Sequence, residues 1–193
     1  MYENIIFFSN SVAYYSIYIY LLINLNATSK LMKKIILLIS LFVGVLAFGQ
    51  QNKMPNVTLK NLDGKNINVS KYNNTNHPVI ISFWATWCGP CINELSAIHN
   101  VYQDWQDELG IELVAISIDD ARTQKRVRPM VNGKGWEYEV ILDDNHNLKR
   151  ALNIINVPYT IVLYKGEVIF EHSNYTPGSE REMYNIIKTK VKK

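Results

Sequence analysis

The feature that most constrains this chain is a pair of cysteines, Cys88 and Cys91, which follow an apolar run and open a segment of helical periodicity. The apolar run, residues 79–84, is short and comes after a proline, as is typical of a buried strand. Residues 90–109 carry apolar side chains at helical spacing, and Gly110 is suited to end that helix. The sequence therefore predicts a dithiol at the junction between a buried strand and a helix.

Strand and helix patterns alternate along the rest of the chain, and this order indicates an α/β fold. Parallel strands with helical crossovers are expected in the middle and hairpins near both ends, which makes the central sheet mixed. Hairpins are expected over 57–69, with its turn at Asp63-Gly64, and over 159–172. Strands are expected over 111–118 and 138–142, and helices over about 121–132 and from Asp143 or Asp144 to about 153. Ser179 and Glu182 are expected to open a last helix as a capping box.

Composition limits the classes of protein to which the chain can belong. Apolar residues make up 48% of the 193 residues, enough for a core, and residues 50–193 are predicted to form one domain that acts as a monomer. Charged residues at 19% and a net charge of +3 argue against disorder and against nucleic-acid binding. Two cysteines cannot staple a small secreted scaffold, so we expect them to form one local dithiol.

Two hydrophobic stretches precede this domain. Residues 32–49 have the three parts of a secretory signal peptide, namely a short basic start, an apolar run of 14 residues and a small-residue cleavage site. That run is short for a bilayer span, which needs about 20 residues. We predict that residues 1–31 are a spurious upstream extension and that translation starts at Met32; a membrane helix at about 5–25 is the alternative. The protein is therefore expected to be periplasmic or secreted, with a membrane tether as the less favoured arrangement.

The place of the dithiol suggests its chemistry. A helix N-terminus presents unpaired N–H groups and a positive potential, so a thiolate there is stabilised relative to a free cysteine, whose pKa is about 8.5. Cys88 is expected to be exposed at the helix tip and to attack a substrate disulfide. Cys91 lies one turn further in, and it is expected to be more buried and to resolve the mixed disulfide.

Other uses of this cysteine spacing stay open. A structural zinc site needs a second pair of ligands, whereas the four histidines are scattered, so we assign no metal site. Pro90 also suits a helix start better than a zinc knuckle. A purely structural disulfide would close a tiny loop with little entropic gain. A peroxidase would use a lone reactive cysteine, which the run Trp87-Cys88-Gly89-Pro90-Cys91 does not favour.

The run from Phe83 to Cys91 resembles the active site of thioredoxin. The signal peptide and the longer domain resemble the exported TlpA/ResA branch of the thioredoxin-like superfamily. The resemblance spans about residues 53–191. It implies a thioredoxin-like fold in which the segment at about 119–138 is an insertion that helps to set the choice of partner.

The resemblance also implies where a substrate binds. Pro158 matches a cis-proline that precedes a strand and faces the dithiol, and a proline before a strand suits a tight turn on local grounds as well. Val157 would offer its backbone to an extended substrate peptide. The implied substrate-binding residues are Trp87, Gly89, Pro90, Val157 and Pro158.

Glu94 is the third residue to which the resemblance gives a role. It lies three residues after Cys91, so on a helix the two side chains share a face. In the exported branch an acidic residue at this place is linked to proton transfer between the cysteines, whereas the alternative is an ordinary solvent-facing glutamate. Thioredoxin carries a buried aspartate in the preceding strand where this chain has Ser82, and because a serine cannot act as that base, Glu94 is the better candidate.

The resemblance implies a thiol-disulfide oxidoreductase that reduces protein disulfides outside the cytoplasm, in cytochrome c maturation or in general repair. Electrons would come from a membrane donor, and the Cys88–Cys91 disulfide would need no other cofactor. The Gly-Pro dipeptide matches thioredoxin, at the reducing end of a scale from about −270 mV to about −120 mV. The alternatives are a dithiol oxidase or isomerase and, from another class, a copper-binding chaperone that holds the metal between the cysteines.

Overall fold

The structure is a computed structural model, and it describes Lys34 and residues 53–192. The predicted upstream extension and, apart from Lys34, the predicted signal peptide lie outside the described residues. The elements are β1 (Thr58–Asn61), β2 (Asn66–Asn68), η2 (Val69–Asn74), β3 (Val79–Trp84), α3 (Gly89–Leu109), β4 (Glu112–Ser117), η3 (Gln124–Arg126), α4 (Val127–Lys134), β5 (Glu139–Leu142), α5 (Asn147–Ala151), β6 (Tyr159–Tyr164), β7 (Glu167–Ser173) and α6 (Ser179–Val191).

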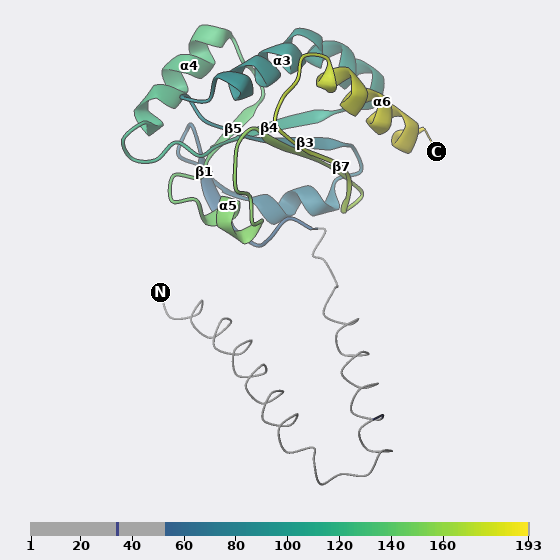
Figure 1. Cartoon of the computed structure of the whole chain (residues 1–193), viewed down its shortest axis with the longest axis horizontal. Coiled ribbons are helices and arrows are strands. Elements are labelled where there is room, and N and C mark those ends of the chain that lie inside the picture. Colours follow the sequence, from purple (N-terminus) through teal and green to yellow (C-terminus); the bar gives the residue numbers. More distant parts are fainter. Residues whose placement is uncertain (1–33, 35–52, 193) are drawn as a thin grey trace. The chain divides into compact units, whose positions relative to one another are not determined.

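A mixed sheet organises the described part of the chain, with seven strands in the order β2-β1-β5-β4-β3-β6-β7. The central strands β3, β4 and β5 run parallel, and every other neighbouring pair is antiparallel. Helices α3, α4 and α6 cover one face of the sheet, while η2 and α5 lie on the other (Figure 1). The predicted α/β fold, with its mixed central sheet and N-terminal hairpin, is confirmed.

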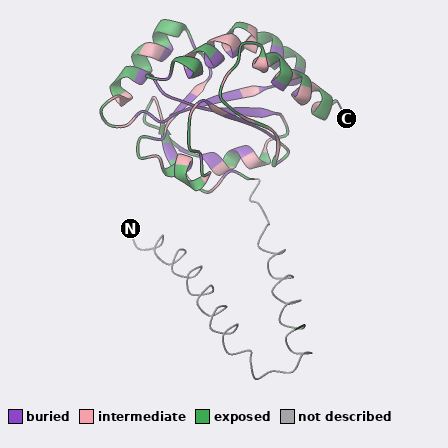
Figure 2. Ribbon diagram, viewed as in Figure 1, coloured by how far each residue is buried: buried purple, intermediate pink, exposed green. Residues whose placement is uncertain are grey.

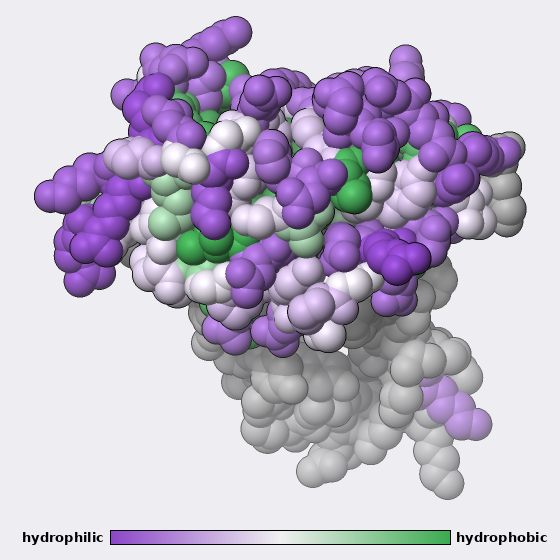
Figure 3. Space-filling view, turned by 90° about the horizontal axis from the view of Figure 1, so that it is seen from above, coloured by the Kyte–Doolittle hydropathy of each residue, from purple (hydrophilic) through white to green (hydrophobic). Residues whose placement is uncertain are grey.

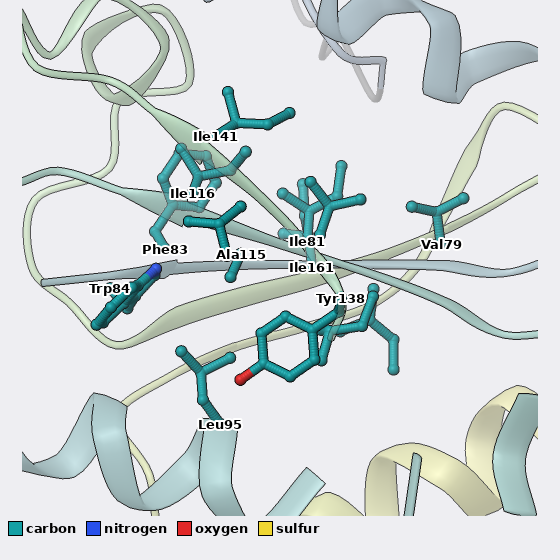
Figure 4. Close-up of a cluster of buried hydrophobic side chains, with 14 of the residues drawn as sticks. Val79, Ile81, Phe83, Trp84, Leu95, Ala115, Ile116, Tyr138, Ile141 and Ile161 are labelled. Atoms are coloured by element: carbon teal, nitrogen blue, oxygen red, sulfur yellow. The ribbon is translucent and has the colours of Figure 1, made fainter. Parts of the chain in front are cut away.

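The core lies on both faces of this sheet. Figure 2 shows buried strands and helices whose outward sides are exposed. All six residues of β3 are buried, as expected for a central strand that is covered on both faces. Trp84 lies beside Leu95 of α3 on one side of the sheet, and Phe83 lies beside Ile116 on the other (Figure 4). The dithiol therefore follows a strand that packing holds from both sides.

Two glycines end their elements as the sequence predicts. Gly64 adopts a φ of 78° in the β1–β2 turn, and its N–H donates to the carbonyl of Asn61 at 3.0 Å. Gly110 adopts a φ of 67° at the C-terminus of α3, and its N–H donates to the carbonyl of Gln106 at 2.8 Å. Both positions need the left-handed region that glycine enters without a Cβ clash.

The helix predicted over 121–132 is wrong at its start. The carbonyl of Asp120 accepts two successive N–H groups, which makes a turn, and α4 begins only at Val127. Pro129 is the third residue of α4, where a backbone N–H has no partner inside the helix. The proline is thus accommodated because the helix begins later than the charge pattern suggested.

The helix predicted from Asp143 or Asp144 to about 153 is shorter, and α5 covers only five residues. Asp143 still acts as a cap, because its carboxylate accepts the N–H groups of Leu148 at 3.1 Å and of Lys149 at 2.8 Å. It does so from four residues before the helix, across a turn in which His146 has a φ of 55°. Asp143 is therefore the capping residue, as predicted, but it acts through a longer loop.

The capping box predicted for Ser179 and Glu182 is wrong. Gly178 is the N-cap of α6, and the hydroxyl of Ser179 is buried with no hydrogen-bond partner among the described residues. The N–H of Gly178 donates to the side chain of Glu180 at 3.0 Å instead. The φ of 99° at Gly178 brings the chain into the helix one residue earlier than a serine cap would allow.

The surface that carries α3, α4 and α6 is mainly hydrophilic, with hydrophobic residues in small separate patches (Figure 3). Among the described residues, no helix combines the length and the apolar character needed to cross a bilayer. The large hydrophobic side chains that are exposed in this part of the chain are Trp87, at 60%, and Ile155, at 82%. Trp87 directly precedes Cys88, and Ile155 lies in the loop between α5 and β6.

Candidate active site

The two cysteines lie at the N-terminus of α3 and form a disulfide, with their Cα atoms 5.3 Å apart. Cys88 is the N-cap, and Gly89, Pro90 and Cys91 are the first three residues of the helix. The backbone N–H of Cys91 donates to the sulfur of Cys88 at 3.3 Å. A side chain at the N-cap commonly accepts this bond, and here the acceptor is the sulfur itself. The sulfur of Cys88 thus faces the free N–H groups of the helix, as the sequence predicts.

The burial of the two sulfurs is partly different from the prediction. Cys91 is fully buried, as expected, but Cys88 is only 6% exposed in the disulfide form. Cys88 remains the more accessible of the two. The exposed group beside it is Trp87, whose ring stands out from the loop at 60% exposure. Trp87 is therefore the most exposed side chain next to the disulfide.

Asp119 fixes the loop that leads to Cys88. Its carboxylate is fully buried and accepts the backbone N–H of Thr86 at 2.8 Å and the hydroxyl of Thr86 at 2.6 Å. It also accepts the hydroxyl of Ser117 at 2.9 Å. The N–H of Cys88 donates to the carbonyl of Ala85 at 3.0 Å, which closes the turn. These bonds hold the chain between β3 and α3 in one conformation. Asp119 was not among the site residues predicted from the sequence.

The proline loop lies at the same edge of the sheet as the dithiol. The Val157–Pro158 peptide is cis, as the resemblance implies. Phe83 near the end of β3 pairs with Tyr159 at the start of β6, so the residue before β6 lies beside the loop that leaves β3. The carbonyl of Pro158 accepts the N–H of Asn174 at 3.0 Å. Pro158 is buried and Val157 is half-buried, which leaves the backbone before the proline at the rim of the site.

Glu94 is buried, with an exposed fraction of 1%, so the alternative of a solvent-facing glutamate is wrong. Its carboxylate accepts the hydroxyl of Thr160 at 3.0 Å, and the hydroxyl of Ser82 lies at 3.4 Å. The Nε2 atom of His172 lies 2.6 Å from the same carboxylate. A buried carboxylate requires such partners, because unpaired it would lose its hydration without compensation. Ser82 thus serves as a donor to Glu94 at the place where thioredoxin carries its own acid.

A hollow lies beside Trp87 at the rim, lined by Ile118, Asp120, Arg122, Thr123 and His146. The hydrogen bond from the Arg122 side chain, at 2.6 Å, lowers the pKa of Asp120, so this carboxylate stays ionised near neutral pH. The Nε2 atom of His146 lies 2.9 Å from the carbonyl of Ile118. The rim thus combines an exposed indole with a charged pair.

Two tyrosines on the proline side stay neutral at neutral pH. Burial, followed by a hydrogen bond to Glu171, raises the pKa of Tyr159. Burial, followed by a hydrogen bond to Glu180, also raises the pKa of Tyr175. Both phenols therefore act as hydrogen-bond donors and not as bases at neutral pH.

Among the described residues, no three histidine, cysteine, aspartate or glutamate side chains gather in a way that would hold a metal ion. Three of the histidines are engaged with other partners, namely His77 with Glu112, His146 with Ile118 and His172 with Glu94.

The sheet and the dithiol together define the class of this protein, which is a thioredoxin-like thiol-disulfide oxidoreductase. Residues 50–188 match the model of the AhpC/TSA family, and the chain belongs to this family. It is 26% identical over 131 residues to the thiol-disulfide oxidoreductase ResA of Bacillus subtilis, in an alignment that covers 67% of this chain and 70% of ResA. The predicted resemblance to the TlpA/ResA type is thereby confirmed.

Solved structures agree with this assignment. An uncharacterized thioredoxin-like protein from Porphyromonas gingivalis is 44% identical, with a TM-score of 0.65 over 73% of this chain and 93% of that one. StoA from Bacillus subtilis shares the fold at 21% identity, with a TM-score of 0.54 over 68% of this chain and 99% of StoA.

Proposed function

We propose that the protein reduces protein disulfides outside the cytoplasm through the Cys88/Cys91 dithiol. The observation that carries this proposal is the sulfur of Cys88 at the N-cap of α3, where it accepts the N–H of Cys91. A sulfur in this position gains most from the helix when it carries negative charge, and the thiolate is the attacking form. This position supports thiol–disulfide exchange through Cys88, and the Gly89-Pro90 dipeptide, which matches thioredoxin, supports the reducing direction that we propose.

The reaction runs in two steps that conserve atoms and electrons. The thiolate of Cys88 attacks one sulfur of the substrate disulfide, so a Cys88–substrate bond forms, the substrate S–S bond breaks and the released substrate thiolate takes up a proton. Cys91 then transfers its proton to Glu94 and attacks the sulfur of Cys88. The Cys88–Cys91 bond forms, and the second substrate thiolate leaves and is protonated. Two electrons have then passed from the protein dithiol to the substrate.

Glu94 is proposed as the base for Cys91 because it combines burial with position. It lies three residues after Cys91 on α3, so the two side chains leave the helix on the same side. Its hydrogen bonds to Thr160 and His172 hold the carboxylate in place. A positioned base of this kind contributes about 10²–10⁴-fold to a rate.

The substrate is proposed to be an extended peptide segment that lies against the proline loop. The half-buried Val157 would pair its backbone with the substrate, as strand addition requires. Trp87 and Ile155 are exposed and would contact apolar side chains of the substrate. Gly89 and Pro90 complete the surface around Cys88 without a bulky side chain of their own.

Export is part of the proposal, with the signal peptide over 32–49 as its support. A reductant in that compartment must be recharged, so we propose a membrane electron donor, and a role in cytochrome c maturation remains one specific form of this function. N-terminal sequencing of the exported protein tests the first point. A mature end near Gln50 supports cleavage, and an intact residue 1 contradicts it.

Trapping of the mixed disulfide tests the proposed reaction. The Cys91→Ser variant keeps the attacking sulfur but cannot resolve the intermediate, so it should form an adduct with a disulfide-containing protein such as insulin, which dithiothreitol releases. The Cys88→Ser variant is the matched control and should form none. The wild-type dithiol should reduce insulin faster than its disulfide oxidises a reduced, unfolded protein. The opposite order would assign the protein as an oxidase, and rapid turnover of hydrogen peroxide would assign it as a peroxidase.

A further inference from the structure

A polar row crosses three neighbouring strands beneath Glu94. Ser82 of β3 is paired with Thr160 of β6, and Thr160 is paired with His172 of β7. Directly paired residues of neighbouring strands point to the same face of a sheet, so these three side chains form one line on the face that α3 covers. The line runs from the fully buried Ser82 and Thr160 to β7, which is the last strand in the sheet.

Glu94 binds this row at every point. Its Oε2 atom lies 3.4 Å from the hydroxyl of Ser82, and its Oε1 atom lies 3.0 Å from the hydroxyl of Thr160 and 2.6 Å from Nε2 of His172. Serine and threonine hydroxyls do not exchange a charge at neutral pH, whereas an imidazole does. His172 is therefore the one member of the row that can take a proton from Glu94 and release it elsewhere.

Glu94 and His172 differ in solvent exposure, and a path that carries a proton from a buried site to solvent requires such a difference. The side chain of Glu94 is 1% exposed and that of His172 is 16% exposed. Among the described residues, Glu94 is the only hydrogen-bond partner of the imidazole ring, and the edge of the ring lies against Phe170 at a centroid distance of 5.3 Å. The ring is thus fixed at one nitrogen and partly open to solvent.

We propose that His172 is the group through which the buried Glu94 exchanges its proton with solvent. This inference rests on the proposed role of Glu94 as the base for Cys91. While Glu94 is ionised, Nε2 of the neutral His172 carries the ring proton and donates it to the carboxylate. After Cys91 gives its proton to Glu94, the ring changes to the Nδ1-protonated tautomer by exchange with solvent; the carboxyl then passes its proton to Nε2 as the Nδ1 proton leaves to water. Glu94 is then ionised again and the ring is back in its first tautomer. His172 acts through Glu94 and is in this sense a positioning residue.

Few other titratable groups face Glu94 and His172. On α3 these are the cysteines, of which Cys91 lies one turn before Glu94. After β7 it is Tyr175. Its pKa is raised first by burial, then by its interaction with Glu180 and to a smaller extent by the charge of Glu94, and its hydroxyl donates to Glu180 of α6 at 3.1 Å. The neighbouring residue of β7, Glu171, binds the hydroxyl of Tyr159. A change in pH dependence on substitution of His172 can therefore be assigned to Glu94, since Tyr175 stays neutral until high pH.

A double-mutant cycle tests the proposal. The rate of disulfide reduction by dithiothreitol, and of dithiol oxidation by a small disulfide, is followed by tryptophan fluorescence in stopped flow between pH 5 and pH 9. The full chain is used in the wild type, His172→Gln, Glu94→Gln and the double variant. Glutamine can still donate a hydrogen bond to Glu94 but cannot carry the proton. His172→Gln should slow the proton-limited step at least about tenfold and change its pH profile. It should have no further effect in the Glu94→Gln background.

His77→Gln is the matched control. His77 also faces a carboxylate, that of Glu112 at 2.9 Å, but it precedes β3 and so lies at the opposite end of that strand from the dithiol. This variant should keep the wild-type rates and pH profile. Urea unfolding of each variant checks that the fold is intact, and His172→Asn is the second variant if His172→Gln unfolds.

The outcomes separate the two proposals. His172→Gln with rates within about twofold of the wild type at all pH values, or with equal slowing in the presence and absence of Glu94, overturns the relay. Glu94→Gln with wild-type rates overturns the role of Glu94 itself. Neither result depends on whether the physiological reaction is reduction or oxidation, because both assays use small thiol reagents.

Discussion

Replacement of Asp119 by alanine should destabilise the protein strongly. The carboxylate is fully buried and accepts three hydrogen bonds, two from Thr86 and one from Ser117, at 2.6 to 2.9 Å. Hydrogen bonds to a charged group contribute about 1.5–3 kcal/mol each, and the loss leaves the buried N–H of Thr86 without a partner. Because the two hydroxyls can turn to other acceptors, we expect a total cost of about 3–5 kcal/mol, as for other broken buried networks. Domains are stable by only about 5–15 kcal/mol.

Asp119→Asn separates charge from shape. The amide keeps one acceptor oxygen for the N–H of Thr86 and the hydroxyl of Ser117, and its NH₂ group can donate to the hydroxyl of Thr86. We therefore expect a cost of about 1 kcal/mol for this variant. The exposed Asp107, whose side chain accepts a bond from Gln103 at 2.9 Å, is the matched control. Asp107→Ala should change stability by less than about 0.5 kcal/mol.

Urea unfolding, followed by circular dichroism in the oxidised state, measures these differences. The midpoint should fall in the order wild type, Asp119→Asn, Asp119→Ala, while the slope of the transition stays constant. Asp119→Ala should also slow the reaction of Cys88 with dithiothreitol, because the loop before α3 is no longer held. An Asp119→Ala protein within about 1 kcal/mol of the wild type would refute the reasoning about this network.

Three further substitutions give independent checks. Trp87→Ala should leave the urea midpoint unchanged, because the ring is 60% exposed, but should slow the reaction with a protein disulfide more than that with a small one; equal slowing would contradict substrate contact. Leu95→Ala removes a fully buried side chain and should cost about 2–5 kcal/mol in urea unfolding, whereas a cost below 1 kcal/mol would contradict the tight packing. Hydrogen bonds from Lys188 and Tyr184 lower the pKa of Glu108 from 4.5 to about 2, so the stabilisation is complete above pH 4.5 and is lost as the pH falls through 2. Glu108→Gln should therefore lower the midpoint at pH 6 but not below pH 2, and less so in high salt because the group is exposed.

The strand–dithiol–helix unit could be predicted from the sequence because its signals are local. The apolar run of β3, the proline at the second position of α3 and the glycine at its C-cap each act within a few residues. The same holds for the glycine turn of the first hairpin. Helix starts that depend on distant or unusual caps, such as Gly178 before α6, were mispredicted because a serine or threonine cap is only the commonest solution.

The partners of the site could not be predicted, because they depend on the register of strands that are far apart in the sequence. His172 meets Glu94 across a separation of 78 residues, and Asp119 meets Thr86 across 33. One signal was available in the sequence. Ser82 and Thr160 are polar residues inside otherwise apolar strands, and a buried polar side chain requires a partner. This signal points to a buried polar group between the two strands, but not to its identity.

The reduction potential of the Cys88–Cys91 pair tests the central claim most directly. It can be measured by equilibration of the protein with dithiothreitol or glutathione buffers at pH 7, with the two redox forms separated after thiol alkylation. We predict a value below about −220 mV, in the range from glutaredoxins to thioredoxin, as a reductant of protein disulfides requires. A value near −120 mV would mean that the pair installs disulfides and would contradict the proposed direction of the reaction.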